Sequence, residues 1–166
     1  MVLGLSLQTF TLLHVLISLV ALAAGVVVVV GMLVNRRPDG WTALFLATTV
    51  ATSASGYLFP ATTVLPSHVV GAISLAVLAL AIAALYGFRL AGAWRWIYVS
   101  SALVAFYLNA FVAVVQAFQK VAFLHPLAPT GSEPPFLVVQ LLVLAVFVAL
   151  GIFAAIRFHP PVARAV

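Results

Sequence analysis

The chain has 166 residues, of which 66% are hydrophobic and only 5% are charged, and its mean hydropathy is +1.33. Soluble domains carry roughly 25% charged residues, so this composition excludes a soluble fold and indicates an all-α integral membrane protein whose main partner is the lipid bilayer. The formal net charge of +5 does not indicate nucleic-acid binding, because the basic residues stand singly or in a pair between apolar runs, as at membrane boundaries. The absence of cysteine excludes disulfides, thiolate metal sites, iron–sulfur clusters and cysteine nucleophiles.

Five apolar segments of about 19–25 residues each are long enough to cross a hydrocarbon core of about 30 Å. We predict a bundle of five transmembrane helices at residues 10–34, 41–59, 67–90, 94–118 and 135–156, joined by short loops into a single domain. The longest loop, 119–134, contains three prolines after Lys120 and should be turn-rich. The first segment follows no basic region and is too long for the core of a signal peptide, so we expect it to be retained.

The arginines predict the orientation of the bundle. With five spans, all six arginines fall on one side of the membrane, and Lys120 alone falls on the other. The positive-inside rule then places the N-terminus outside and the C-terminus in the cytoplasm, in a bacterial inner membrane. Removing or merging one span would scatter the arginines over both sides, which supports the span count. The arginines are Arg36, Arg37, Arg89, Arg95, Arg157 and Arg164.

The fourth segment carries a polar stripe. Tyr98, Asn109, Gln116 and Lys120 are spaced eleven, seven and four residues apart, so at about 100° per residue they share one helix face. A polar stripe on an apolar helix should face other helices rather than lipid. We therefore predict that this segment lies centrally, with the stripe facing the first three segments.

Polar residues also collect in the predicted outer halves of the other segments, most densely in residues 48–57 of the second. Lipid cannot satisfy such groups, so they either bond to one another between helices, at roughly 0.6–2 kcal/mol per contact, or line a wet cavity. The second interpretation predicts an outward-facing pocket for a small solute or lipid. Its candidate residues are Asn109, Gln116, Lys120, Gln140, Tyr57 and Ser53.

Three of the four histidines, His14, His68 and His125, are predicted near the outer face. Imidazole suits zinc, copper, iron and nickel, so these side chains could hold a divalent metal. Alternatively, His14 and His68 could be the axial ligands of haem b between the first and third segments. No two histidines have i, i+4 spacing and no carboxylate lies within the spans, so the sequence requires no cofactor.

Other chemistries lack the residues they need. The two acids, Asp39 and Glu133, fall on opposite sides of the membrane, and no phosphate-binding loop or mid-membrane acid is present. At the outer face, Lys120 could instead join Glu133 and His125 in binding an anionic group.

The sequence therefore indicates no catalytic residue and favours a non-enzymatic protein. It would bind or pass a small solute or lipid, or serve as a subunit of a membrane assembly. A haem- or metal-binding redox protein is the alternative. A packing subunit without a ligand is a third hypothesis, in which Gly25, Gly31 and other small residues allow close helix contact or homo-oligomerisation.

Overall fold

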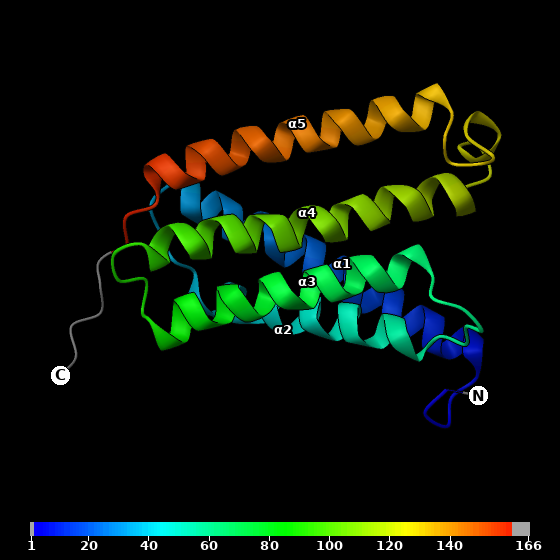
Figure 1. The fold of residues 1–166 in the computed structure, drawn as a ribbon, viewed down its shortest axis with the longest axis horizontal. Helices are drawn as coiled ribbons and strands as arrows, with labels where there is room; N and C mark the ends of the chain where they lie inside the picture. The colour runs from blue at the N-terminus through cyan, green and yellow to red at the C-terminus, as the bar shows by residue number, and fades with distance from the viewer. Residues whose placement is uncertain (1, 161–166) are drawn as a thin grey trace.

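The computed structural model describes residues 2–160, which form five α-helices joined by short connections (Figure 1). A π-helical turn extends the third helix, and short 3-10 helices follow the second and precede the fifth. The predicted all-α class is confirmed, and each predicted segment corresponds to one helix within a few residues. Of the six arginines used to predict the orientation, Arg164 lies outside the described residues. The helices are α1 (Leu7–Leu33), α2 (Asp39–Ser55), α3 (Pro66–Ile82), α4 (Trp94–Lys120) and α5 (Pro134–Arg157), and the short pieces are η1 (Gly56–Leu58), the π-helical η2 (Ala83–Gly87) and η3 (His125–Leu127).

Four of the five helices are long and apolar enough to cross a membrane. They are α1, α3 with its π-helical extension, α4 and α5. The second helix is shorter, with 17 residues, and contains several hydroxyl side chains. Length and composition therefore support a membrane bundle, and α2 is the helix whose crossing needs a separate argument.

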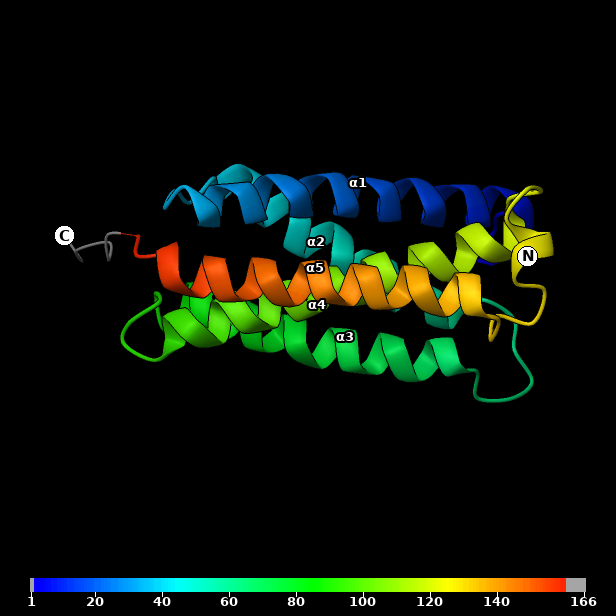
Figure 2. The ribbon, with the colours of Figure 1, turned by 90° about the horizontal axis from the view of Figure 1, so that it is seen from above.

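The helices run up and down along the long axis of the molecule (Figures 1 and 2). The chain turns back after each helix, so α1, α3 and α5 point one way and α2 and α4 the other. The α1–α2 pair packs closely, α2 also contacts α3, and α4 packs between α3 and α5. Because α4 additionally contacts α1 and α2, the predicted central position of this helix is confirmed.

Local sequence explains where several helices begin and end. The Ser6 side chain accepts a hydrogen bond from the Thr9 backbone N–H and caps the start of α1, while Pro66 and Pro134 occupy first-turn positions that need no N–H donor. At the end of α5, the Arg95 guanidinium donates hydrogen bonds to the carbonyl oxygens of Ala155 (3.1 Å) and Phe158 (2.7 Å). This arginine therefore ties the start of α4 to the end of α5.

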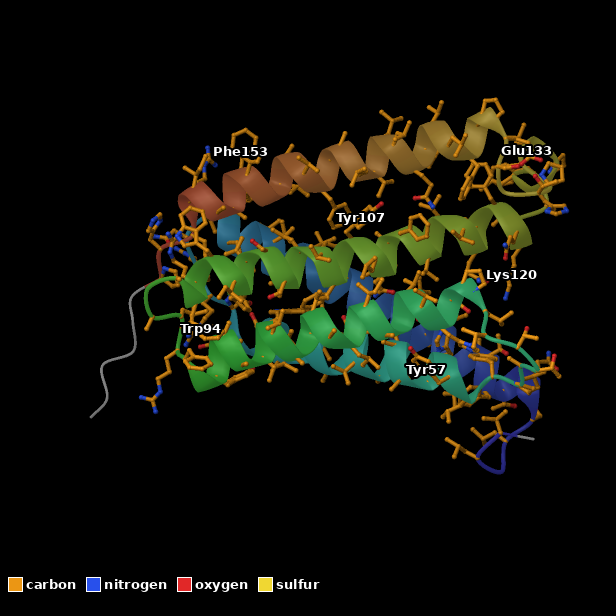
Figure 3. The ribbon with its side chains drawn as sticks, viewed as in Figure 1. Tyr57, Trp94, Tyr107, Lys120, Glu133 and Phe153 are labelled. Atoms are coloured by element: carbon orange, nitrogen blue, oxygen red, sulfur yellow. The ribbon has the colours of Figure 1, made fainter. Side chains whose placement is uncertain are left out.

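The charged residues lie at the two ends of the bundle. We call the end formed by the α1–α2 connection, the α3–α4 connection and the end of α5 the arginine end, because it carries Arg36, Arg37, Arg89, Arg95 and Arg157. We call the opposite end, formed by the start of α1, the η1–α3 connection and residues 120–133, the lysine end. Trp94 marks the arginine end in Figure 3, and Lys120 and Glu133 mark the lysine end.

The large hydrophobic core occupies the half of the bundle next to the arginine end. It is built from residues 24–32 of α1, 45–46 of α2, 78–85 of α3 and η2, 98–106 of α4 and 154–158 at the end of α5. Towards the lysine end, by contrast, α1 has no buried residue between positions 11 and 20, and α4 has none between 107 and 117. A smaller cluster of Phe118, Ala128 and Phe136 holds only α4, α5 and the loop between them. The two halves of the bundle are therefore packed very differently.

α1 and α4 approach each other closely at Gly25. A Cβ placed on this residue would lie 2.7 Å from atoms of the Phe106 ring. The ring has little room to move, because it also packs edge-to-face against Phe45 and Phe147. Only glycine therefore permits this approach of the two helices.

We predict that Gly25→Ala lowers the free energy of unfolding by about 1–3 kcal/mol, the usual cost of overpacking a well-filled core. Denaturant titration of the purified protein in detergent would measure it. Gly56→Ala is the matched control, because its Cβ would meet no atom within 4 Å and its φ of −56° suits any residue. Equal stability of the Gly25→Ala and original proteins would contradict the close contact.

Candidate functional site

The polar residues of α1, α2 and α3 towards the lysine end largely bond to one another. The Ser18 hydroxyl donates to Thr52 Oγ1 (3.3 Å), joining α1 to α2, and the Ser53 hydroxyl donates to Ser74 Oγ (2.9 Å), joining α2 to α3. The Tyr57 hydroxyl donates to the backbone oxygen of His68, and its ring stacks on the His68 imidazole. Ser53 and Tyr57, both predicted pocket residues, thus act as interhelical ties in this structure.

The histidines occupy separate positions. His14 on α1 forms a 2.8 Å hydrogen bond between its Nδ1 and Ser55 Oγ on α2, and its ring packs edge-on to Phe59. His125 is exposed in the loop between α4 and α5. No group of three or more His, Cys, Asp or Glu side chains within residues 2–160 is placed to hold a metal. The predicted three-histidine site is therefore not assembled among the described residues: His14 and His68 bond to different local partners, and His125 is exposed in a loop.

A local hydrogen bond also limits His68 as a haem or metal ligand. Its Nδ1 accepts the backbone N–H of Leu65 at 3.2 Å and so helps to cap the start of α3. A neutral imidazole that accepts at Nδ1 carries its proton on Nε2, and therefore has no lone pair there for a metal. The two-histidine haem site stays a prediction, and it requires this capping bond to break.

The α4 stripe changes its surroundings along its length. Tyr98 is buried in the core, Asn109 is half-buried, and Gln116 and Lys120 are exposed. Figure 3 shows Lys120 pointing from the end of α4 towards α1 and α3, and its charge is close enough to act on His14. The burial of the stripe therefore falls along α4 towards the lysine end, and the orientation of the whole stripe towards the first three helices stays a prediction.

Two buried amide groups lie beside this uncovered region without full hydrogen bonding. Asn109 Nδ2 is buried and has no partner among the described residues. On α5, Gln140 Nε2 donates to the backbone oxygen of Phe111 (3.2 Å), whereas its Oε1 is buried and unpaired within the same part of the chain. An unpaired buried polar atom costs about 1–3 kcal/mol, so both groups favour a water or ligand partner.

Glu133 is occupied by its own loop. Loss of hydration raises the pKa of this carboxyl, but hydrogen bonds from the backbone and side chain of Thr130 and from the Ser132 backbone outweigh it and lower the pKa to about 2. The carboxylate thus orders the turn before α5. It forms no salt bridge with Lys120 in the described structure, so the Lys120 charge is free to meet an anionic group.

The two hollows that stand out in the structure lie away from the predicted pocket residues. One is an apolar groove of about 220 Å³ between α4 and α5, with Tyr107, Phe147 and Gly151 among its lining residues. The other, of about 360 Å³, lies at the arginine end and is lined by Arg37, Asp39, Leu85, Tyr86 and Arg89. None of the six predicted pocket residues lines either hollow.

Sequence reasoning used Arg37 and Arg89 only to orient the bundle and did not combine them into a site. The available signal was that the first and third connections both end on the same side and both carry arginine. Chain comparison adds no further assignment: neither a protein-family model, a curated protein nor a solved structure matches this sequence.

Proposed function

We propose that the protein is a multi-pass protein of the bacterial cytoplasmic membrane, with its arginine end in the cytoplasm and its lysine end outside. The support is the separation of charge: all five arginines of the described chain lie at one end and the lysine lies at the other. An excess of arginine and lysine marks the cytoplasmic side of membrane proteins. Trp41, Trp94 and Trp96 at the arginine end fit an interfacial aromatic belt.

In this proposal α2 is the fifth span, despite its short length. The 17 residues of α2 and the three of η1 together advance about 30 Å, which matches the hydrocarbon core. Connectivity requires the same crossing, because α1 ends at the arginine end and α3 begins at the lysine end. The hydroxyls of α2 are tolerated because they bond to the backbone or to neighbouring helices, as Thr49 does to the Phe45 carbonyl (2.7 Å).

Single-cysteine labelling tests this topology, since the chain has no cysteine of its own. We expect Thr62→Cys, in the exposed connection before α3, to react with a membrane-impermeant maleimide on intact cells. Arg36→Cys, in the connection before α2, should react only after the membrane is opened. Labelling of both positions, or of neither, on intact cells would place the two ends of α2 on the same side and contradict the five-span arrangement.

We further propose that the lysine-end half is a water-filled pocket that binds a small polar or amphipathic molecule without transforming it. The unpaired amide of Asn109 is the single observation that carries this proposal, because it lies on the stripe that ends at Lys120. Buried amides in membrane helices are satisfied by a partner or by water.

The packing of the neighbouring helices supports this proposal. Between positions 107 and 117 of α4 and between 11 and 20 of α1, every residue is at least partly exposed, although the Asn109 Nδ2 atom itself is buried. A ligand could reach Asn109 from the outside along these two helices, past the charge of Lys120.

Thiol reactivity distinguishes a wet pocket from a packed or lipid-covered one. We expect Asn109→Cys and Gln116→Cys to react with a charged methanethiosulfonate reagent added from outside, because only water supports the reactive thiolate. Val104→Cys is the matched control: it lies on the same helix, is 41% exposed and faces the apolar groove, so lipid should keep it unreactive. Unreactive Asn109→Cys and Gln116→Cys would contradict the pocket.

A second candidate function, as a subunit of a membrane assembly, has one observation in its favour. α5 is the least buried of the four long helices and is apolar over most of its surface. A partner helix could cover this surface. Lipid would cover it equally well, so we place this function second.

A further inference from the structure

The pocket at the arginine end has the composition of an anion site. It measures about 360 Å³ and is lined by Arg37, Asp39, Leu85, Tyr86 and Arg89. Two stretches of the chain form it: the end of the α1–α2 connection with the first residue of α2, and the π-helical η2 with the connection that follows it. We propose that this pocket binds a phosphate group, carried either by an anionic lipid headgroup or by a small soluble phosphate ester. This site lies at the opposite end from the pocket proposed above and does not depend on it.

The charges of the lining residues give the pocket a net positive charge. The one salt bridge of the described chain joins Arg37 to Asp39, and a second contact between the same two side chains fixes the guanidinium in place. Arg89 therefore has no carboxylate partner in residues 2–160. A free guanidinium beside an oriented one suits a phosphate, whose oxygens accept paired N–H donors.

Two hydroxyl side chains, those of Tyr98 and Thr42, are buried in the half of the bundle next to the arginine end. Tyr98 and Thr42 are each only 1% exposed, and neither of them lines the pocket. The Thr42 side-chain oxygen is buried without a hydrogen bond to any described residue. Thr42 also belongs to the first turns of α2, whose start has no side-chain cap. Uncapped N–H groups and the helix dipole at this end favour a negative charge.

The backbone around Arg89 is held in an uncommon conformation. Arg89 and Leu90 have φ values of 50° and 60°, in the left-handed region that L-residues other than Asn and Asp rarely adopt. Packing on either side maintains it: Phe88 stacks on Trp94 with ring centroids 3.6 Å apart, and Leu90 is buried in the core. Strained residues and π-helical turns occur frequently at functional sites. Here the strained backbone presents Arg89 to the pocket.

Thermal unfolding of the 166-residue chain in neutral detergent micelles tests the proposal. The probes are phosphatidylglycerol and phosphatidylcholine added to the micelles, and inorganic phosphate compared with chloride at equal ionic strength. We expect phosphatidylglycerol to raise the unfolding temperature more than phosphatidylcholine. Arg89→Gln should raise the half-saturating concentration about tenfold, because a hydrogen bond between charged groups contributes about that factor or more.

Two further variants separate the pocket from general electrostatics. Arg157→Gln removes a charge from the same end but outside the pocket, so it should leave the half-saturating concentration unchanged. Arg89→Lys keeps the positive charge but lacks the paired N–H donors of arginine, so it should weaken binding less than Arg89→Gln. If the Arg89→Gln protein does not fold, the Arg89→Lys protein is measured in its place.

Each outcome decides the proposal. Stabilisation by phosphatidylglycerol alone identifies a lipid headgroup, and stabilisation by inorganic phosphate as well identifies a soluble phosphate source. Equal effects of phosphatidylglycerol and phosphatidylcholine, together with no effect of phosphate, would overturn the site. Equal weakening by Arg89→Gln and Arg157→Gln would also overturn it, because the pocket would then contribute nothing beyond surface charge.

Discussion

The arrangement of the bundle depends on the close approach of α1 and α4 at Gly25 and Phe106. Two straight helices that cross at an angle touch at one level and separate away from it. On the arginine side of this contact, the space is filled by large side chains such as Met32, Tyr98 and Phe158, all of which are buried. On the lysine side, the only other apolar core cluster of the described residues is the small one of Phe118, Ala128 and Phe136, and hydroxyl and amide side chains lie between the helices. The Gly25–Phe106 contact therefore lies at the boundary where the packed half of the bundle gives way to the less buried half.

Much of the fold could be predicted from the sequence because the bilayer imposes simple rules. Apolar runs of the required length predicted all five helices within a few residues, and the arginine pattern separates the two ends of the bundle. Helical spacing also placed Tyr98 and Asn109 on one face. By contrast, the hydrogen-bond partners of individual polar side chains could not be predicted. The bonds from Ser53 to Ser74 and from Leu65 to His68 depend on how the helices are rotated and offset, which the periodicity of the sequence does not determine.

The arginine-end pocket could not be predicted for a related reason. Its residues come from two stretches of the chain, 37–39 and 85–89, that lie far apart in the sequence, and Arg89 follows a π-helical turn with a left-handed backbone. No local sequence pattern signals that conformation at an arginine followed by a leucine. The positive-inside rule explains why Arg37 and Arg89 share an end, but not why they share a pocket. Our account gives the two ends different roles, with anion binding at the arginine end and an open polar pocket at the lysine end.

Hydrogen–deuterium exchange along α4, measured by mass spectrometry on protein in lipid nanodiscs, tests this account most directly. We predict strong protection of residues 98–106, where the helix lies in the core, and faster exchange of residues 107–117, where water would reach the backbone. Uniform protection along the whole helix would show that the lysine-end half is closed. That result would contradict the division of the bundle into a packed half and an open half.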